Sequence, residues 1–102
     1  MAAAGSIFKA LADPTRREIL RELRAGELAA GEIAARFPIS APSISRHLAL
    51  LKSAELVAER RDANRILYRL QPETLASAVG DFLSTVCPTQ VLQRRRRTRR
   101  SR

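Results

Sequence analysis

Small, hydrogen-bonding and cationic side chains gather between Ser40 and Lys52. Serine hydroxyls both donate and accept hydrogen bonds, and an arginine such as Arg46 can bond the edge of a guanine bidentately. These groups suit reversible recognition of phosphates and base edges, in which no covalent bond forms or breaks. The residues expected to take part are Ser40, Ala41, Ser43, Ser45, Arg46, His47 and Lys52.

A second group of cations flanks residues 62–64. Arg60 and Arg61 precede this segment, and Arg65 follows it. Cations beside a turn can bind a phosphate backbone. Charges also keep an exposed strand edge from pairing with another chain, so a purely solubilising role is the alternative.

A helix that begins near Ser40, within the segment Ile39–Val57, must position the first group. Ser40 can cap its start, and Pro42 falls in the first turn, where proline is tolerated. The apolar positions, which recur at spacings of four and three, are Ile44, Leu48 and Leu51. That face should be buried, which leaves the polar face in solvent with no acid before Glu55. His47 lies at the border, where packing with a hydrogen bond to a phosphate or backbone group is expected rather than metal binding or catalysis.

Other segments carry the signals of regular structure. Asp13 can cap a helix that opens at Pro14, and Gly26 closes it. Alternation on both sides of residues 62–64 indicates a hairpin, in which Ile66, Tyr68 and Leu70 alternate with Arg65, Leu67 and Arg69. The expected helices cover 14–23, 31–37 and 72–86, and the expected strands cover 57–61 and 65–70. The fold class is therefore mainly α with a small β-hairpin.

The segments before Asp13 and after Pro72 carry more apolar residues than one small core needs. These apolar residues are Ile7, Phe8, Leu11, Leu75, Val79, Phe82, Leu83 and Val86. Surplus apolar surface favours pairing with a second copy of the chain. Packing of both stripes onto their own protomer is the alternative.

Positive charge is concentrated at the C-terminus. The 102 residues carry a formal charge of +9, but seven of the 19 basic residues lie in 94–102. We therefore expect a nearly balanced domain over 1–93 and a disordered basic tail over 94–102. Such a tail is either a solvated extension or an arm that adds affinity for nucleic acid without regard to sequence.

Several classes of protein are not expected. No run of apolar residues is long enough for a membrane span and no secretory leader is apparent, which predicts a cytoplasmic protein. Cys87 and His47 are the only cysteine and histidine, too few for an ordinary zinc site or an intrachain disulfide. We expect Cys87 to be a structural thiol, and a disulfide between two subunits is the alternative. No motif for a phosphate loop, a metal cluster or a catalytic triad is present, so neither an enzyme nor a cofactor is expected.

Four segments, taken in their order along the chain, resemble the arsenic-repressor (ArsR) family of bacterial winged helix-turn-helix regulators over about residues 6–86. They are FKALADPTRREIL, GEIAARF, ISAPSISRHLALLKSAELV and a basic hairpin closing on LYRL. The resemblance implies an α-α-α-α-β-β-α order, a homodimer, recognition helices in successive major grooves and wings on the flanking backbone or minor groove. Within the family the chain looks most similar to the metal-independent autorepressors related to the sporulation-delay immunity repressor.

The resemblance also bears on metal sensing. Metal-sensing members carry a cysteine-rich version of residues 27–32, where this chain has Ala29 and Gly31. A site on the last helix would need histidines and carboxylates, and residues 72–86 offer only Glu73 and Asp81. Sensing of a soft metal at these positions is not expected, and no effector is indicated.

A sequence-specific repressor of a palindromic operator is thus the leading hypothesis, with autoregulation implied by the resemblance alone. A nucleic-acid-coating or nucleoid-associated protein dominated by its basic tail is the alternative. Arg16 and Arg17 can touch the DNA backbone or pair with Glu22 or another acid.

Overall fold

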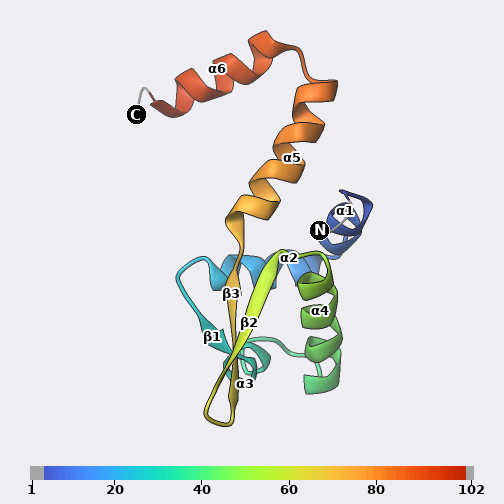
Figure 1. The fold of residues 1–102 in the computed structure, drawn as a ribbon, viewed down its shortest axis with the longest axis vertical. Helices are drawn as coiled ribbons and strands as arrows, with labels where there is room; N and C mark the ends of the chain where they lie inside the picture. Colours follow the sequence, from blue (N-terminus) through green and yellow to red (C-terminus); the bar gives the residue numbers. More distant parts are fainter. Residues whose placement is uncertain (1–3, 101–102) are drawn as a thin grey trace.

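The computed structural model describes the backbone of residues 4–100 and the side chains of 5–94. In this range the helices are α1 (Ala4–Leu11), α2 (Pro14–Leu23), α3 (Ala30–Ala34), α4 (Ala41–Ser53), α5 (Pro72–Val86) and α6 (Thr89–Arg100). The strands are β1 (Leu28–Ala29), β2 (Val57–Asp62) and β3 (Arg65–Leu70). The predicted mainly helical fold with its small hairpin is confirmed, and β1 and α6 are additions to it (Figure 1).

Two predicted caps start the helices that matter most for the site. The carboxylate of Asp13 accepts the backbone N–H of Arg16 at 3.0 Å, at the start of α2. The hydroxyl of Ser40 accepts the N–H of Ser43 at 3.3 Å, at the start of α4. Each cap satisfies one of the donors that a helix N-terminus leaves unpaired.

A left-handed residue closes α4 and turns the chain into β2. Glu55 has φ of 61°, and its N–H donates to the carbonyl of Lys52 at 2.9 Å. The N–H of Leu56 donates to the carbonyl of Leu51 at 3.0 Å, and both of these leucines are buried. This is the Schellman arrangement, in which two hydrogen bonds and an apolar contact end a helix.

The predicted helix over 31–37 is shorter than expected. It ends at Ala34, and the next two bonds run from Arg36 to Ile33 and from Phe37 to Ala34. Bonds to the third preceding residue belong to a tighter turn, which brings the chain to Pro38 and then to α4.

The sheet has the order β1-β3-β2 and is antiparallel throughout. Leu28 of β1 pairs with Tyr68 of β3, which pairs in turn with Glu59 of β2. With only two residues, β1 is too short to show periodicity in the sequence. The hairpin turn between Asp62 and Arg65 also has two residues, one fewer than the sequence predicts.

The central strand β3 is covered on both faces. Tyr68 and Leu70 pack against the core, as their alternation suggests, but Leu67 on the other face is the more buried, at 6% exposed. Leu67 lies beside Ala29 of β1, which is also buried. The added strand therefore explains why an apparently outward position is apolar.

The core lies among α1 to α4 and the start of β2. Its members include Ile7, Ala10, Ile19, Leu20, Leu23, Ile33, Ile44, Leu48, Leu51, Ala54, Leu56 and Val57. The predicted apolar face of α4 is thus buried. In contrast, no residue of α5 is buried, although Leu75 and Ala78 pack against the core.

The N-terminal end of α4 and the β2–β3 turn lie at one end of the molecule, whereas α1 and α5 lie at the other (Figure 1). No helix within residues 4–100 is both long and apolar enough to cross a bilayer.

Beyond α5 the chain turns at Pro88 into α6, which continues to Arg100 where the sequence predicts a disordered tail. From Thr89 to Arg100 the sequence has neither glycine nor proline and is rich in arginine, a good helix former. Residues 101–102 of the predicted tail lie outside the described residues, and the division at residue 94 stays a prediction.

Candidate nucleic-acid interface

The polar face of α4 is open to solvent. Ser40, Ala41, Ser45, Arg46 and Lys52 are exposed, and Ser43 and His47 are half-buried. The structure therefore brings the first predicted group together on one helix. The buried face of α4 fixes this surface against the core.

A short hydrogen-bond chain orders the first turns of α4. The hydroxyl of Ser40 donates to that of Ser43 at 3.0 Å, and Nη2 of Arg46 donates to Ser43 Oγ at 3.1 Å. A guanidinium has five N–H donors, so Arg46 keeps several for a base edge or a phosphate. Ser43 thus both lies on the surface and orients Arg46.

His47 faces the α1–α2 corner. Its Nδ1 lies 3.2 Å from Nη1 of Arg16 and 3.9 Å from the carboxylate of Asp13. The N–H of Arg16, and to a smaller extent His47, lowers the pKa of the Asp13 carboxyl. His47 therefore helps to hold α4 on α2, and its contact with DNA stays a prediction.

Arg16 and Arg17 close the C-terminal end of α1. Nε of Arg16 donates to the carbonyl of Ala10 at 2.7 Å and Nη2 to that of Lys9 at 3.1 Å, while Arg17 donates to Leu11 at 2.7 Å. The carbonyl of Lys9 also accepts the N–H of Ala12 at 3.2 Å. The last carbonyls of a helix lack the usual partner one turn further on, and cations favour this end of the helix dipole. The suggested pairing with Glu22 is not observed, because Glu22 accepts from Arg36 at 2.6 Å.

Most cations expected on the hairpin have an acidic neighbour. Arg60 donates to both carboxylate oxygens of Glu27, through Nε and Nη2, each at 2.8 Å. Lys52 donates to the carboxylate of Glu59, and Arg65 lies 3.5 Å from that of Asp62. All the cationic side chains in these pairs are more than half exposed, so the single contacts of Lys52 and Arg65 are weak and screened by salt. The pair of Arg60 with Glu27 is bidentate, which is the geometry in which an exposed ion pair can fix two side chains.

The cationic partners change the pKa of the acids in these pairs. The hydrogen bond from Arg60 lowers the pKa of the Glu27 carboxyl, and the one from Lys52 lowers the pKa of Glu59. The sequence pattern did not single out Glu27 or Glu59. Glu27 stands 33 residues before Arg60, and only the sheet brings the two together.

The residues predicted to pair two copies of the chain differ in their exposure to solvent. Phe8 and Phe82 meet edge to face with ring centroids 5.4 Å apart, and Phe82 is 50% and Val86 61% exposed. Leu83 is also exposed, whereas Leu11, Leu75 and Val79 are half-buried. Ile7 is only 3% exposed and packs in the core of its own protomer. Four apolar side chains of α1 and α5 thus remain open.

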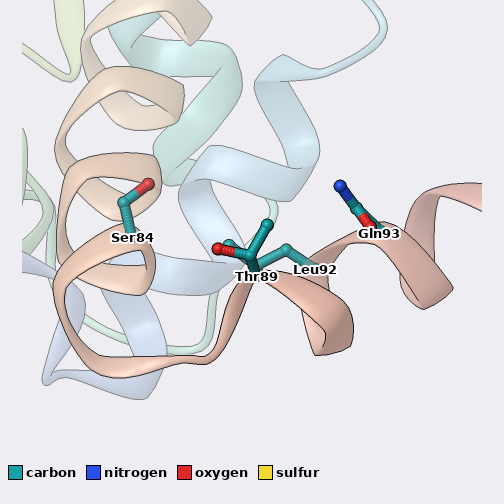
Figure 2. A pocket seen from close by; sticks show the side chains of 4 residues that line it. All are labelled: Ser84, Thr89, Leu92 and Gln93. Carbon is teal, nitrogen blue, oxygen red and sulfur yellow. The ribbon is translucent and has the colours of Figure 1, made fainter.

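The described residues also line hollows away from the polar face of α4. One, of about 240 Å³, is lined by Ser84 of α5 and by Thr89, Leu92 and Gln93 at the turn into α6 (Figure 2). The other, of about 510 Å³, lies between α3 and the hairpin tip and is lined by Ala29, Ala30, Gly31, Glu32, Asn64, Arg65 and Ile66.

The second hollow includes the positions where the resemblance implies cysteines in metal sensors. Ala29 and Gly31 bring no ligating side chain, and the carboxylate of Glu32 accepts the N–H of Ala29 at 2.7 Å. In the part of the chain with described side chains, no cluster of three His, Cys, Asp or Glu residues is arranged to hold a metal. Cys87 is a free, half-buried thiol at the end of α5.

A family model described as a helix-turn-helix domain matches residues 11–60. The transcriptional repressor SdpR of Bacillus subtilis (strain 168) is 43% identical over 81 residues, which cover 79% of this chain and 90% of the relative. This match agrees with the branch that the sequence suggests.

Solved structures agree with this fold. The ArsR-like transcriptional regulator from Rhodococcus sp. RHA1 is 31% identical with a TM-score of 0.73, over 96% of this chain and 90% of that one. The homodimeric winged helix-turn-helix DNA-binding domain of Mb0332 from Mycobacterium bovis is 30% identical with a TM-score of 0.67, over 79% and 76%. The chain therefore belongs to the ArsR family of winged helix-turn-helix transcriptional regulators.

Proposed function

We propose that this protein is a homodimeric transcriptional repressor that binds an operator in double-stranded DNA through α4 and the β2–β3 hairpin. The polar face of α4 carries the proposal. It presents serine hydroxyls and two cations without an acidic residue between Ala41 and Ser53, and its other face is anchored in the core. An α-helix of this kind fits the major groove, where donors and acceptors on base edges report sequence.

The position of the hairpin supports the same function. Its turn lies at the same end of the molecule as the start of α4 (Figure 1). Arg61 and Arg65 are exposed there. In a winged helix-turn-helix protein such residues contact the backbone beside the groove that the helix enters, which fixes the register of the protein on DNA.

A second copy of the chain is the partner proposed for α1 and α5. Phe8, Phe82, Leu83 and Val86 form an apolar surface that the protomer does not cover. The related Mb0332 domain is homodimeric. Two copies place two recognition helices on half-sites about one turn of DNA apart, about 34–36 Å, which is why such operators are palindromic.

The proposal includes no catalysis and no metal. Its chemistry is reversible contact with DNA, and Ala29 and Gly31 cannot ligate a metal in the α3 region. Because the partner is bacterial chromosomal DNA, the proposed site of action is the cytoplasm. We expect operator affinity to be unchanged when Zn(II) is added or removed with a chelator.

Selection of DNA fragments by the purified chain tests this function. We expect enrichment of a palindrome that is bound at least about 10³-fold more tightly than random duplex. A ratio near one would favour the alternative, a nucleic-acid-coating protein dominated by its arginine-rich tail. In that case a chain ending at Gln93 would lose most of its affinity and of its dependence on salt.

A further inference from the structure

Arg60 and Arg61 of β2 extend from opposite faces of the sheet, because side chains alternate along a strand. Arg61 shares its face with Val57, which is buried together with apolar residues of α4. Arg60 lies opposite Leu67, which pairs with Ala29 of β1 on the other face. Two adjacent arginines that look equivalent in the sequence are thus on different sides of the hairpin.

Arg60 is held on its side by Glu27. The two hydrogen bonds of 2.8 Å engage both oxygens of the carboxylate. Glu27 stands directly before β1, whereas Arg60 lies on β2, and β3 runs between these two strands. The pair therefore spans the sheet from one edge strand to the other and braces the hairpin against the α2–β1 segment.

Arg61 is differently placed. Its side chain is exposed on the face that α4 packs against, and among the side chains of 5–94 it forms no ion pair. The acid next to it on this face is Glu59, whose carboxylate accepts from Lys52; the charge of Arg61 lowers the pKa of this carboxyl to a smaller extent than the hydrogen bond from Lys52 does. The exposed guanidinium of Arg61 therefore lies on the same face of the sheet as α4.

We propose that, of the two adjacent arginines of β2, Arg61 binds a DNA phosphate and Arg60 is a positioning residue which holds the hairpin through Glu27. The inference rests on the proposed function in one respect, that the partner is duplex DNA. It divides a basic pair that sequence alone treats as one group.

Fluorescence anisotropy can test the different roles of Arg60 and Arg61. It measures binding of the full chain to the selected operator and to random duplex over a range of NaCl concentrations. Arg61→Ala should weaken binding to both duplexes about tenfold. It should also reduce the slope of log affinity against log salt by about 0.9 for each bound protomer. Arg60→Ala removes the same charge one residue away and should leave the slope unchanged.

The charge-reversed pair E27R/R60E supplies the positioning test. It keeps the net charge and restores an ion pair across the sheet. In Arg60→Ala, the backbone amides of the hairpin should exchange with solvent faster than in the wild type. In E27R/R60E their exchange should slow again, and the slope of log affinity against log salt should equal that of the wild type. A reduced slope in Arg60→Ala or in the swap, or an unchanged slope in Arg61→Ala, would overturn the inference.

The proposed function and the roles proposed for Arg60 and Arg61 are tested by different measurements. The operator-to-random affinity ratio of the wild type tests the proposed function. The slopes of the variants test the roles of Arg60 and Arg61 on either duplex, whether or not an operator is preferred.

Discussion

Asp13 links the start of α2 to α4 through Arg16 and His47. Replacement by alanine removes the cap of α2, and we expect a loss of about 1 kcal/mol in the free energy of unfolding at pH 7. An asparagine side chain could still accept the N–H of Arg16, so Asp13→Asn should lose less. Urea unfolding of the wild type and both variants measures this order, and equal stability of Asp13→Ala and the wild type would contradict it.

The acid range separates the charge of Asp13 from its cap. Because the folded pKa of Asp13 lies below its ordinary value of 3.8, its carboxylate stabilises the fold above that pH and ceases to do so as the pH falls through the folded value. The stability gap between the wild type and Asp13→Asn should therefore close as the pH is lowered below 3.8. A gap that persists in acid would show that the charge is not its cause.

Arg46 is the exposed side chain of α4 that we expect to read a base. Arg46→Ala should cost about 1–3 kcal/mol in operator binding and relax discrimination at one base pair of each half-site. Anisotropy with operators substituted at single positions gives the result. Arg21→Ala, which removes an exposed cation of α2 paired with Glu18, is the control and should leave the preference intact. An equal loss on operator and random DNA would assign Arg46 to the phosphates instead.

The hairpin turn imposes a conformation that suits glycine. Ala63, the first of its two central residues, has φ of 59°, a value that glycine adopts without a steric cost. Ala63→Gly should therefore stabilise the protein by up to about 1 kcal/mol, seen as a higher Tm. The same substitution at Ala58, inside β2, should lower Tm. A lower Tm for both variants would mean that the turn is not strained.

The sequence predicted elements with strong local signals and missed those that depend on pairing across the chain. The bounds of α2 and α5 agree with prediction because a cap or a proline marks each start, whereas β1 is defined only by its bonds to β3. The polar residues of α4 were predicted as a group because helical spacing places them on one face. The roles of Arg16, Glu27 and Glu59 depend on contacts between separate elements, which no local pattern reveals.

The exposed apolar surface of α1 and α5 is the proposed dimer interface of the molecule. Phe82→Asp places a charge in the proposed dimer interface, so we expect monomers with little operator affinity, because one half-site supplies too few contacts. Sedimentation and anisotropy check both parts. Ser84→Asp on the same helix, at the hollow beside α6, is the matched control and should remain dimeric. A monomeric Phe82→Asp that still bound its operator tightly would refute the proposed dimer.

Arg16 bonds carbonyls at the end of α1 and touches the ring of His47 on α4. In the proposed dimer, α1 belongs to the contact between subunits and α4 to the contact with DNA. The distance between the two recognition helices then depends on how firmly each α4 is tied to its own α1. We therefore expect Arg16, which ties α1 to α4 within one protomer, to influence the separation of half-sites that the proposed dimer accepts.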